Sequence, residues 1–376
     1  MSTVCYEIAY TPAKRGIHRY SEALIREYRS VAKEVRLLLF TYFFRDFNAK
    51  RDSLLPLTQG KFDFLARRVP DSLVEKLEWE YGIPVIEALL RKQSVQVYHS
   101  PAPRLPHFKK IRTVITAHDL FFERYPELCN PVMGRLARDA ANRADHIVTE
   151  SEMAKGELRD FYGIPAGKVT VIPLAVDRAR FVRSPDETLL EVKARYRLPD
   201  HFVLSVGPAG PHRNFEGLLE GMAVLRQKHP GVELVLIARP QQMGKPFDEI
   251  YHRLGRPGWV RFYAQVPEED FPAFYSLALL FSRIEHYDGY GLPFLEAMSC
   301  GTAVIGSKRG AIPEIIGQGA AYADPDSAED IAHQIEHLMT DTEYRNGRIA
   351  YANERLMSFS WAETARRTFD VYRSLL

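Results

Sequence analysis

Residues 288–301 read DGYGLPFLEAMSCG and combine two carboxylates with a glycine-flanked turn. Asp288 precedes the turn, and Glu296 lies eight residues later, inside the apolar run that follows Pro293. Glycines permit unusual backbone angles and proline suits a first helical turn, so we predict a loop-to-helix junction. The amides at a helix start suit a diphosphate or sugar oxygens. On residue types alone, a helix capped by Asp288 with a solvated Glu296 is an equally good interpretation.

A second loop, residues 207–214 with the sequence GPAGPHRN, lies between a predicted strand and a predicted helix. Gly207 would let the backbone approach a ligand closely, and Arg213 could bind a phosphate through two N–H groups. A flexible turn with a solvated arginine fits this loop equally well. Together, however, the two loops offer a cation for phosphate and carboxylates for hydroxyl groups. A nucleotide sugar has both kinds of group, so we predict a nucleotide-sugar site.

Short apolar runs alternate with amphipathic segments along most of the chain, as in doubly wound parallel sheets. In the first half, we expect strands at residues 4–10, 35–42, 95–99, 113–117, 146–150 and 169–172. In the second half, we expect strands at residues 202–207, 232–238, 260–263, 277–282 and 302–307. The helices that we expect span residues 17–31, 131–144, 189–196, 215–228, 268–276, 328–339 and 365–376.

The chain of 376 residues is too long for one compact core, so we predict two domains. The alternation pauses at residues 173–199 and then resumes, which places a domain boundary there. The predicted fold class is α/β, with two Rossmann-like parallel-sheet domains that face a cleft. His118 directly follows the predicted strand 113–117, at a carboxyl end where ligand contacts gather in such sheets.

Composition excludes several classes of protein. With 46% hydrophobic and 26% charged residues and a net charge of +2, the chain is an ordinary globular protein without a nucleic-acid partner. Cys5, Cys129 and Cys300 are widely separated, so we expect neither a zinc site nor disulfides. The twelve histidines show no HExxH motif, and we expect no metal. Because no signal peptide and no run of 18 apolar residues is present, we expect a cytoplasmic protein.

Aromatic and basic residues are interleaved between Phe40 and Arg68. From Arg26 to Arg68 the sequence contains ten lysines and arginines but only five acidic residues, an excess of positive charge in a nearly neutral chain. Such a segment could lie against anionic lipid as a peripheral membrane contact, bind a phosphorylated acceptor, or pack its rings into the core. Core packing is the favoured interpretation for most of the aromatic rings.

The two loops resemble the donor-binding half of retaining glycosyltransferases of family 4 (glycosyl transferases group 1), which have the two-Rossmann-domain GT-B fold. That family usually shows a glycine loop ending Pro-Arg-Lys-Asn and a Glu-x7-Glu motif. This chain has Pro211-His212-Arg213-Asn214 and the segment 288–301. Further matches are Gly16-Ile17-His18-Arg19-Tyr20, His118-Asp119-Leu120, Gly310-Ala311-Ile312-Pro313-Glu314 and Phe359-Ser360-Trp361. The resemblance covers nearly the whole chain and implies an acceptor-side domain at 1–175, completed by a helix at about 360–376, and a donor domain at 176–359.

The resemblance also implies roles for individual residues. Glu296 would hold the nucleotide ribose, Asp288 would lie by the transferred sugar, and Arg213 would bind the diphosphate. His118 would contact the donor sugar from the other domain, and Gly16 would come close to the pyrophosphate and the acceptor. The implied catalytic residues are Asp288, His118 and Arg213. The implied donor-binding residues are Gly16, Gly207, His212, Arg213, Asn214, Gly289, Tyr290, Gly291, Leu292 and Glu296.

Two residues depart from the family pattern. His212 replaces the usual arginine and is mostly uncharged near neutral pH, and Asp288 replaces a glutamate one methylene longer. Either change could alter sugar preference or weaken catalysis. Because Arg213 keeps the positive charge, we expect an active enzyme.

The implied reaction is metal-independent transfer of a hexose-type sugar, with retention, from a GDP- or UDP-sugar to a glycan or lipid-linked acceptor. Such an enzyme would serve polysaccharide biosynthesis, at the inner face of the plasma membrane if the basic aromatic segment binds lipid. Electrostatic stabilisation of the leaving diphosphate and closure of the domains would be its main contributions. Two alternatives remain open, a nucleotide-sugar epimerase of the same fold and a non-catalytic sugar-nucleotide-binding subunit.

Overall fold

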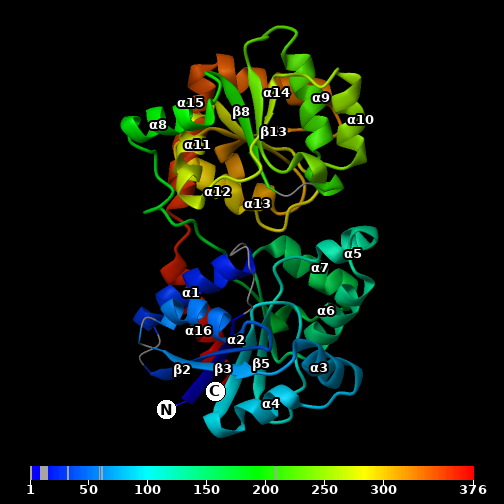
Figure 1. Cartoon of the computed structure of the whole chain (residues 1–376), viewed down its shortest axis with the longest axis vertical. Helices are drawn as coiled ribbons and strands as arrows, with labels where there is room; N and C mark the ends of the chain where they lie inside the picture. The colour runs from blue at the N-terminus through cyan, green and yellow to red at the C-terminus, as the bar shows by residue number, and fades with distance from the viewer. Residues whose placement is uncertain (1, 9–15, 32–33, 59, 61, 208–209) are drawn as a thin grey trace. The chain divides into compact units, whose positions relative to one another are not determined.

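The computed structural model describes residues 2–8, 16–31, 34–58, 60, 62–207 and 210–376 (Figure 1). The chain forms two compact units, and each has its own parallel sheet. Unit 1 comprises Met1–Leu174 and Ser360–Leu376, and unit 2 comprises Ala175–Phe359. The predicted α/β class with two Rossmann-like domains is therefore confirmed.

Unit 1 has a seven-stranded sheet in the order β3-β2-β1-β4-β5-β6-β7, with every pairing parallel. Its strands are β1 (Ser2–Glu7), β2 (Val35–Phe43), β3 (Asp63–Arg68), β4 (Val95–Ser100), β5 (Arg112–Thr116), β6 (His146–Thr149) and β7 (Val169–Val171). Its main helices are α1 (Ile17–Val31), α2 (Phe47–Thr58), α3 (Asp71–Glu75), α4 (Val85–Leu90), α5 (Phe121–Arg124), α6 (Pro131–Arg143), α7 (Glu152–Tyr162) and α16 (Trp361–Leu375).

Unit 2 has a six-stranded parallel sheet in the order β10-β9-β8-β11-β12-β13. Its strands are β8 (Phe202–Val206), β9 (Glu233–Ile237), β10 (Val260–Phe262), β11 (Leu280–Arg283), β12 (Val304–Ser307) and β13 (Ala320–Ala323). Its main helices are α8 (Asp186–Tyr196), α9 (Phe215–Leu225), α10 (Lys245–Arg253), α11 (Phe271–Leu277), α12 (Leu292–Ser299), α13 (Ile312–Ile316), α14 (Ala328–Thr340) and α15 (Thr342–Leu356).

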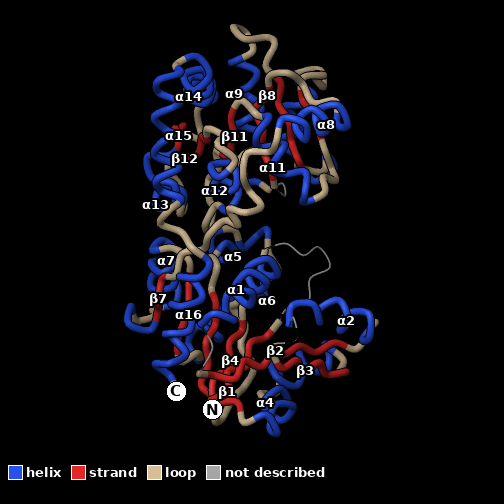
Figure 2. Tube along the Cα trace, turned by 90° about the vertical axis from the view of Figure 1, so that its left-hand side faces the viewer, coloured by secondary structure: helices blue, strands red, loops and turns tan. Residues whose placement is uncertain are grey.

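In unit 2 the central strands β8, β11 and β12 are buried along their whole length, because helices cover both faces of the sheet (Figure 2). All five residues of β8 are buried, which explains why apolar runs predicted the strands so well. Two of the four edge strands gave weaker signals: β3 carries Asp63, Arg67 and Arg68, and β13 is a short alanine-rich strand. Neither of these two strands was predicted.

The C-terminal helix α16 returns to unit 1 and packs against α1. The Tyr372 hydroxyl lies 2.6 Å from the Tyr28 hydroxyl and 2.6 Å from His99 Nδ1, and all three side chains are buried. At the start of α16, the Thr364 hydroxyl donates to the carbonyl of Pro173 at 2.7 Å. These hydrogen bonds join the last residues of the chain to the first unit.

Candidate active site

The loop-to-helix junction predicted from the sequence is present after β11 in unit 2. Helix α12 begins at Leu292 with Pro293 in its first turn, and Gly291 occupies the N-cap position with a φ of 91°. Glycine is favoured there, because side chains are strained at this backbone angle. The cap position thus belongs to Gly291, and the interpretation of Asp288 as the cap is wrong. Asp288 Oδ1 instead accepts a 3.1 Å hydrogen bond from the Tyr290 amide within the loop.

Glu296 lies in the second turn of α12 and is only 5% exposed, so the interpretation of a solvated glutamate is wrong. Its Oε2 accepts a 2.9 Å hydrogen bond from the Tyr275 hydroxyl of α11. Tyr275 is itself fully buried. A buried carboxylate needs such partners, and the bond also fixes the orientation of its oxygens.

The loop that carries Arg213 connects β8 to α9, and its residues 208–209 lie outside the described residues. Gly207 has a φ of 140°, and Pro211–Arg213 form a short 3₁₀ turn. Asn214 caps α9 and donates to the carbonyls of Ile284 at 3.0 Å and Pro325 at 2.7 Å. Its buried amide therefore ties this loop to the segment after β11.

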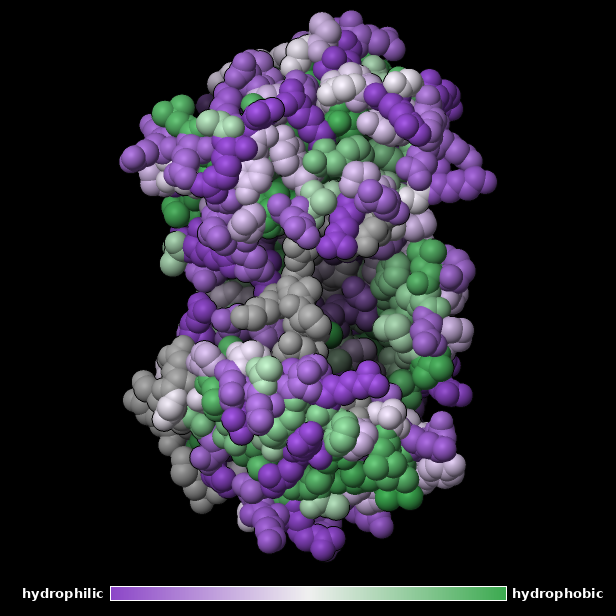
Figure 3. All heavy atoms as spheres, in the orientation of Figure 1, coloured by the Kyte–Doolittle hydropathy of each residue, from purple (hydrophilic) through white to green (hydrophobic). Residues whose placement is uncertain are grey.

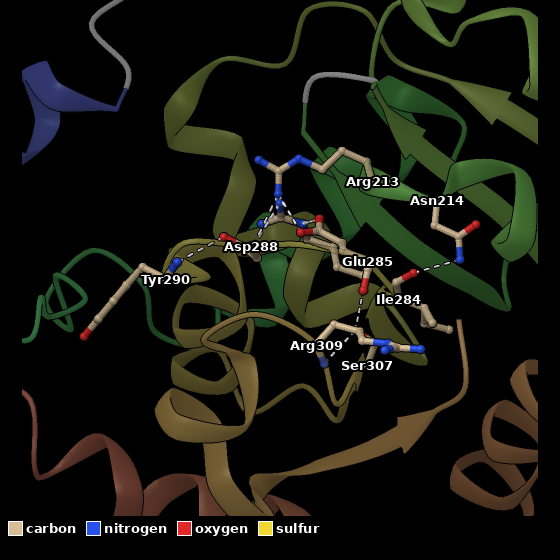
Figure 4. A network of polar contacts seen from close by, with 9 residues as sticks. Arg213, Asn214, Ile284, Glu285, Asp288, Tyr290, Ser307 and Arg309 are labelled. Atoms are coloured by element: carbon tan, nitrogen blue, oxygen red, sulfur yellow. Dashed lines mark hydrogen bonds and ion pairs between the residues drawn. The ribbon is translucent and has the colours of Figure 1, made fainter. Parts of the chain in front are cut away.

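Arg213 and Asp288, predicted in separate loops, are brought together in a network that we call the charge cluster (Arg213, Arg283, Glu285 and Asp288). Arg213 Nη1 donates to Glu285 Oε2 at 2.6 Å and to Asp288 Oδ2 at 3.3 Å (Figure 4). Arg283 Nη2 lies 3.2 Å from the same Asp288 oxygen, and Arg283 Nε donates to Glu285 Oε1. The contacts close a circuit in which positive and negative groups alternate.

Burial sets the electrostatics of this region. It raises the pKa of Glu285 well above its usual value, against the opposing effect of the Arg213 charge and together with the negative charge of Asp288. Burial and the neighbouring Arg213 lower the pKa of His212 to about 4. His212 is therefore neutral at pH 7 and adds no charge at the position where the family carries an arginine.

In unit 1, His118 follows β5 and is held by acceptors on both sides. Its Nδ1 is hydrogen-bonded to the Glu150 carboxylate, and its Nε2 lies 3.0 Å from the Pro101 carbonyl. Burial is the largest effect and opposes protonation of His118, but the charge and hydrogen bond of Glu150, the Pro101 carbonyl and the charge of Asp119 together outweigh it, so the His118 pKa is raised. An imidazolium donates from both nitrogens and satisfies both acceptors. The Tyr20 ring packs edge-on against His118, with centroids 5.1 Å apart.

The remaining predicted residues lie at the starts of helices. Gly16 is exposed, has a φ of 57°, and its carbonyl accepts a hydrogen bond from the Tyr20 amide at the start of α1. Gly289 and Tyr290 are buried beside the N-cap of α12, and Leu292 is its first residue. Thus Gly16 and His118 belong to unit 1, and all the other predicted site residues belong to unit 2.

Three charged residues of these networks were missed in the sequence. Arg283 ends β11, Glu285 follows it, and Glu150 follows β6. The rule that singled out His118, a polar residue at the carboxyl end of a parallel strand, applies to all three. Within the described ranges, no three His, Cys, Asp or Glu side chains gather as metal ligands would.

Comparison with known proteins agrees with this geometry. The family model described as glycosyl transferases group 1 matches residues 189–355, and the model described as glycosyltransferase family 4 matches residues 15–180. The O-antigen chain mannosyltransferase B of Escherichia coli is 30% identical over 380 residues, which cover 96% of each chain. The serotype-specific mannosyltransferase WbdA of Escherichia coli is 32% identical over 290 residues, and the match covers 73% of this chain and 34% of that protein.

Among solved structures, sucrose-phosphate synthase from Thermosynechococcus elongatus superposes with a TM-score of 0.76. The match covers 100% of this chain and 99% of that chain at 18% identity, and therefore speaks for the fold alone. Family models match both halves of the chain, and one relative matches it over nearly its full length. The fold is consistent with the same family. The chain belongs to the glycosyltransferases of group 1 and family 4 and has their GT-B fold.

Proposed function

We propose that this glycosyltransferase transfers a mannosyl residue, with retention of configuration and without a metal, from a nucleotide diphosphate sugar to a glycan or lipid-linked hydroxyl. The observation that carries the proposal is the meeting of Arg213 and Asp288 beside the start of α12. A cation, a carboxylate and helix-terminal amides then lie together in unit 2. These groups are complementary to a diphosphate joined to a sugar.

In this proposal, Arg213 and the amides of the 289–291 loop stabilise the charge that develops on the leaving diphosphate. Glu296 accepts hydrogen bonds from the ribose hydroxyls, with its orientation set by Tyr275. The departing phosphate oxygen accepts the proton of the incoming hydroxyl as the new glycosidic bond forms. His118 keeps its two ring N–H groups on Glu150 and Pro101, so its proposed contribution to catalysis is its positive charge.

Mannose is proposed because both Escherichia coli relatives are named mannosyltransferases. The test is a transfer assay of the purified chain with GDP-mannose, UDP-glucose and UDP-galactose, read with a panel of glycan acceptors. We expect transfer from GDP-mannose only. Equal transfer from the UDP-hexoses would refute the mannose assignment, and absence of transfer from every donor would refute the enzyme.

Retention and metal independence need their own measurements. Proton NMR of the first product formed should show the anomeric configuration of the donor sugar. Turnover should be unchanged in EDTA, and an inverted product or a loss of turnover restored by Mg²⁺ would contradict the respective part of the proposal. Incubating the donor without an acceptor tests the epimerase alternative, because an epimerase would convert the sugar without transfer. Donor binding without turnover on any acceptor would instead indicate a binding subunit.

The acceptor is proposed to be glycan or lipid-linked, at the cytoplasmic face of the membrane. In the segment Phe40–Arg68, the structure buries Phe40 and Phe43 but leaves Phe44 47% exposed, with the Arg68 guanidinium 5.3 Å from its ring centroid. Lys50 lies similarly over the Phe43 ring, at 5.7 Å. Core packing therefore explains two of the rings, and the basic groups around Phe44 support a peripheral contact with anionic lipid.

Other exposed apolar side chains belong to the same unit. Figure 3 shows apolar groups gathered over α3, where Leu73 is 47% exposed, and Tyr81 and Ile83 are 61% and 47% exposed. Among the described residues, no helix is both long and apolar enough to cross a bilayer. Sedimentation with phosphatidylglycerol vesicles tests the contact. We expect binding at low salt that is weakened in Phe44→Ser, and failure of the wild-type chain to sediment would refute it.

A further inference from the structure

Arg283 and Glu285 have no role in the proposed reaction, yet they supply half of the charge cluster. Arg283 is 5% exposed and Glu285 is 2% exposed, while Arg213 is 19% exposed. Two carboxylates thus contact Arg213, the cation proposed for the diphosphate. Buried charges of this kind are costly unless each is paired, so the balance within the cluster is strongly constrained.

A count of charges shows what each member does. Burial raises the pKa of Glu285, but each of its oxygens accepts an N–H group, one from Arg213 and one from Arg283, and this contact with two guanidiniums stabilises the ionised form. Arg213 alone, against ionised Glu285 and Asp288, would leave one net negative charge where a diphosphate must bind. His212 is neutral and cannot compensate for it. Arg283 contacts both carboxylates and brings the sum to zero. The family usually has an arginine at the position of His212. In this chain Arg283, at the end of β11, carries a positive charge beside the same loops.

The backbone around Glu285 holds the cluster in place from three directions. The Asn214 side chain donates to the carbonyl of Ile284, and the Ser307 hydroxyl donates to the carbonyl of Glu285. The amide of His286 donates to the carbonyl of His212 at 2.9 Å, which joins the two site loops. Glu285 then places one carboxylate oxygen on each guanidinium. Such preorganised charges act on a ligand without reorganisation at the moment of reaction.

We propose that Arg283 and Glu285 are positioning residues of the donor site: Arg283 neutralises the two carboxylates so that Arg213 can attract the diphosphate, and Glu285 orients both guanidiniums. This inference rests on the proposed function and deepens it. It assigns to both residues an effect on the phosphates of the donor, and none on its base and ribose.

The test compares GDP with guanosine by titration calorimetry, or UDP with uridine if the wild-type chain prefers UDP. We expect Arg283→Gln to weaken nucleoside diphosphate binding by about tenfold or more and to leave nucleoside binding unchanged. The double variant R283Q/E285Q removes one charge of each sign and should recover most of the diphosphate affinity. It should still show a low kcat, because a neutral amide with one oxygen holds Arg213 less firmly than the Glu285 carboxylate does.

Two further variants keep the test informative. Arg283→Lys retains the charge if Arg283→Gln does not fold, and it should bind GDP within about threefold of the wild type with a lowered kcat. Arg261→Gln is the control. It breaks the pair between Arg261 of β10 and Glu233 of β9, elsewhere in unit 2, and should leave the binding of GDP and guanosine unchanged.

Equal loss of nucleoside and diphosphate affinity in Arg283→Gln would overturn the inference, and so would a double variant as weak as the single one. If Arg213→Ala weakens GDP binding but Arg283→Gln does not, the inference fails and the proposed function stands. A wild-type chain that binds neither GDP nor UDP would overturn both.

Discussion

The Tyr275 hydroxyl and the Glu296 carboxylate lie 2.9 Å apart between α11 and α12, and both side chains are buried. Tyr275 thereby fixes the carboxylate that we assign to the ribose. In the proposed site a ribose hydroxyl donates to this carboxylate, so Glu296→Gln should weaken binding of GDP and guanosine alike, by about tenfold. Tyr275→Phe should mainly destabilise the fold, by about 1–3 kcal/mol, because it leaves a buried acceptor short of a partner.

Calorimetry with both ligands and urea unfolding measure these two effects. Glu191→Gln, an exposed glutamate of the same unit, is the control and should change neither quantity. Unaltered nucleoside affinity in Glu296→Gln would contradict the ribose assignment.

Removal of Arg213 should abolish transfer. Arg213→Ala deletes the cation proposed for the leaving diphosphate, and loss of one such group typically lowers kcat by about a hundredfold or more. The variant should remain folded with a lower melting temperature, because Glu285 and Asp288 would share only Arg283. Rates with saturating donor and thermal melts separate the two effects, with the exposed Arg253→Ala as the matched control. Near-normal turnover of Arg213→Ala would remove the proposal.

The His118–Glu150 pair should make stability depend on pH. The pKa of His118 is raised in the folded state above its ordinary value of 6.5, so the folded state binds the proton more tightly than the unfolded chain does. This contribution is fully present below about pH 6.5 and is lost as the pH rises through the folded pKa.

Urea unfolding of the wild type and of Glu150→Gln, at about pH 5.5 and about pH 9, measures the effect. The free-energy difference between the two proteins should be larger at the lower pH. A difference that is constant or grows with pH would contradict a protonated His118.

His212 should make stability depend on pH in the direction opposite to that of His118. Its pKa is lowered to about 4, below the ordinary 6.5, so the unfolded chain binds more protons between these values. The stability held by neutral His212 is therefore present above about pH 6.5 and is lost as the pH falls towards about 4. His212→Asn cannot titrate, and its stability should fall less than that of the wild type between about pH 7 and about pH 5. Parallel losses in the two proteins would show that His212 is not buried as a neutral group.

The sequence by itself determined the central strands of both sheets and many of the longer helices. Helix α1 spans the predicted Ile17–Val31, and Asn130 and Ser151 cap α6 and α7 as residues of their types commonly do. Both features depend on residues a few positions apart, and short-range rules describe such contacts well. Buried central strands were found for a similar reason, since most of their residues are apolar.

Only the tertiary structure decided which charges meet. Arg213 follows β8 and Asp288 follows β11, with β9 and β10 between them in the chain, yet β8 and β11 are neighbours in the sheet. That strand order places the carboxyl ends of β8 and β11 side by side. Arg283 and Glu285, at the end of β11, therefore reach Asp288 and Arg213, respectively. Asp288 is buried and contacts Arg213 instead of capping the helix. Glu296 is buried as well, and it contacts Tyr275 instead of solvent. Strand order and burial arise from the packing of the whole sheet, which no local stretch of sequence specifies.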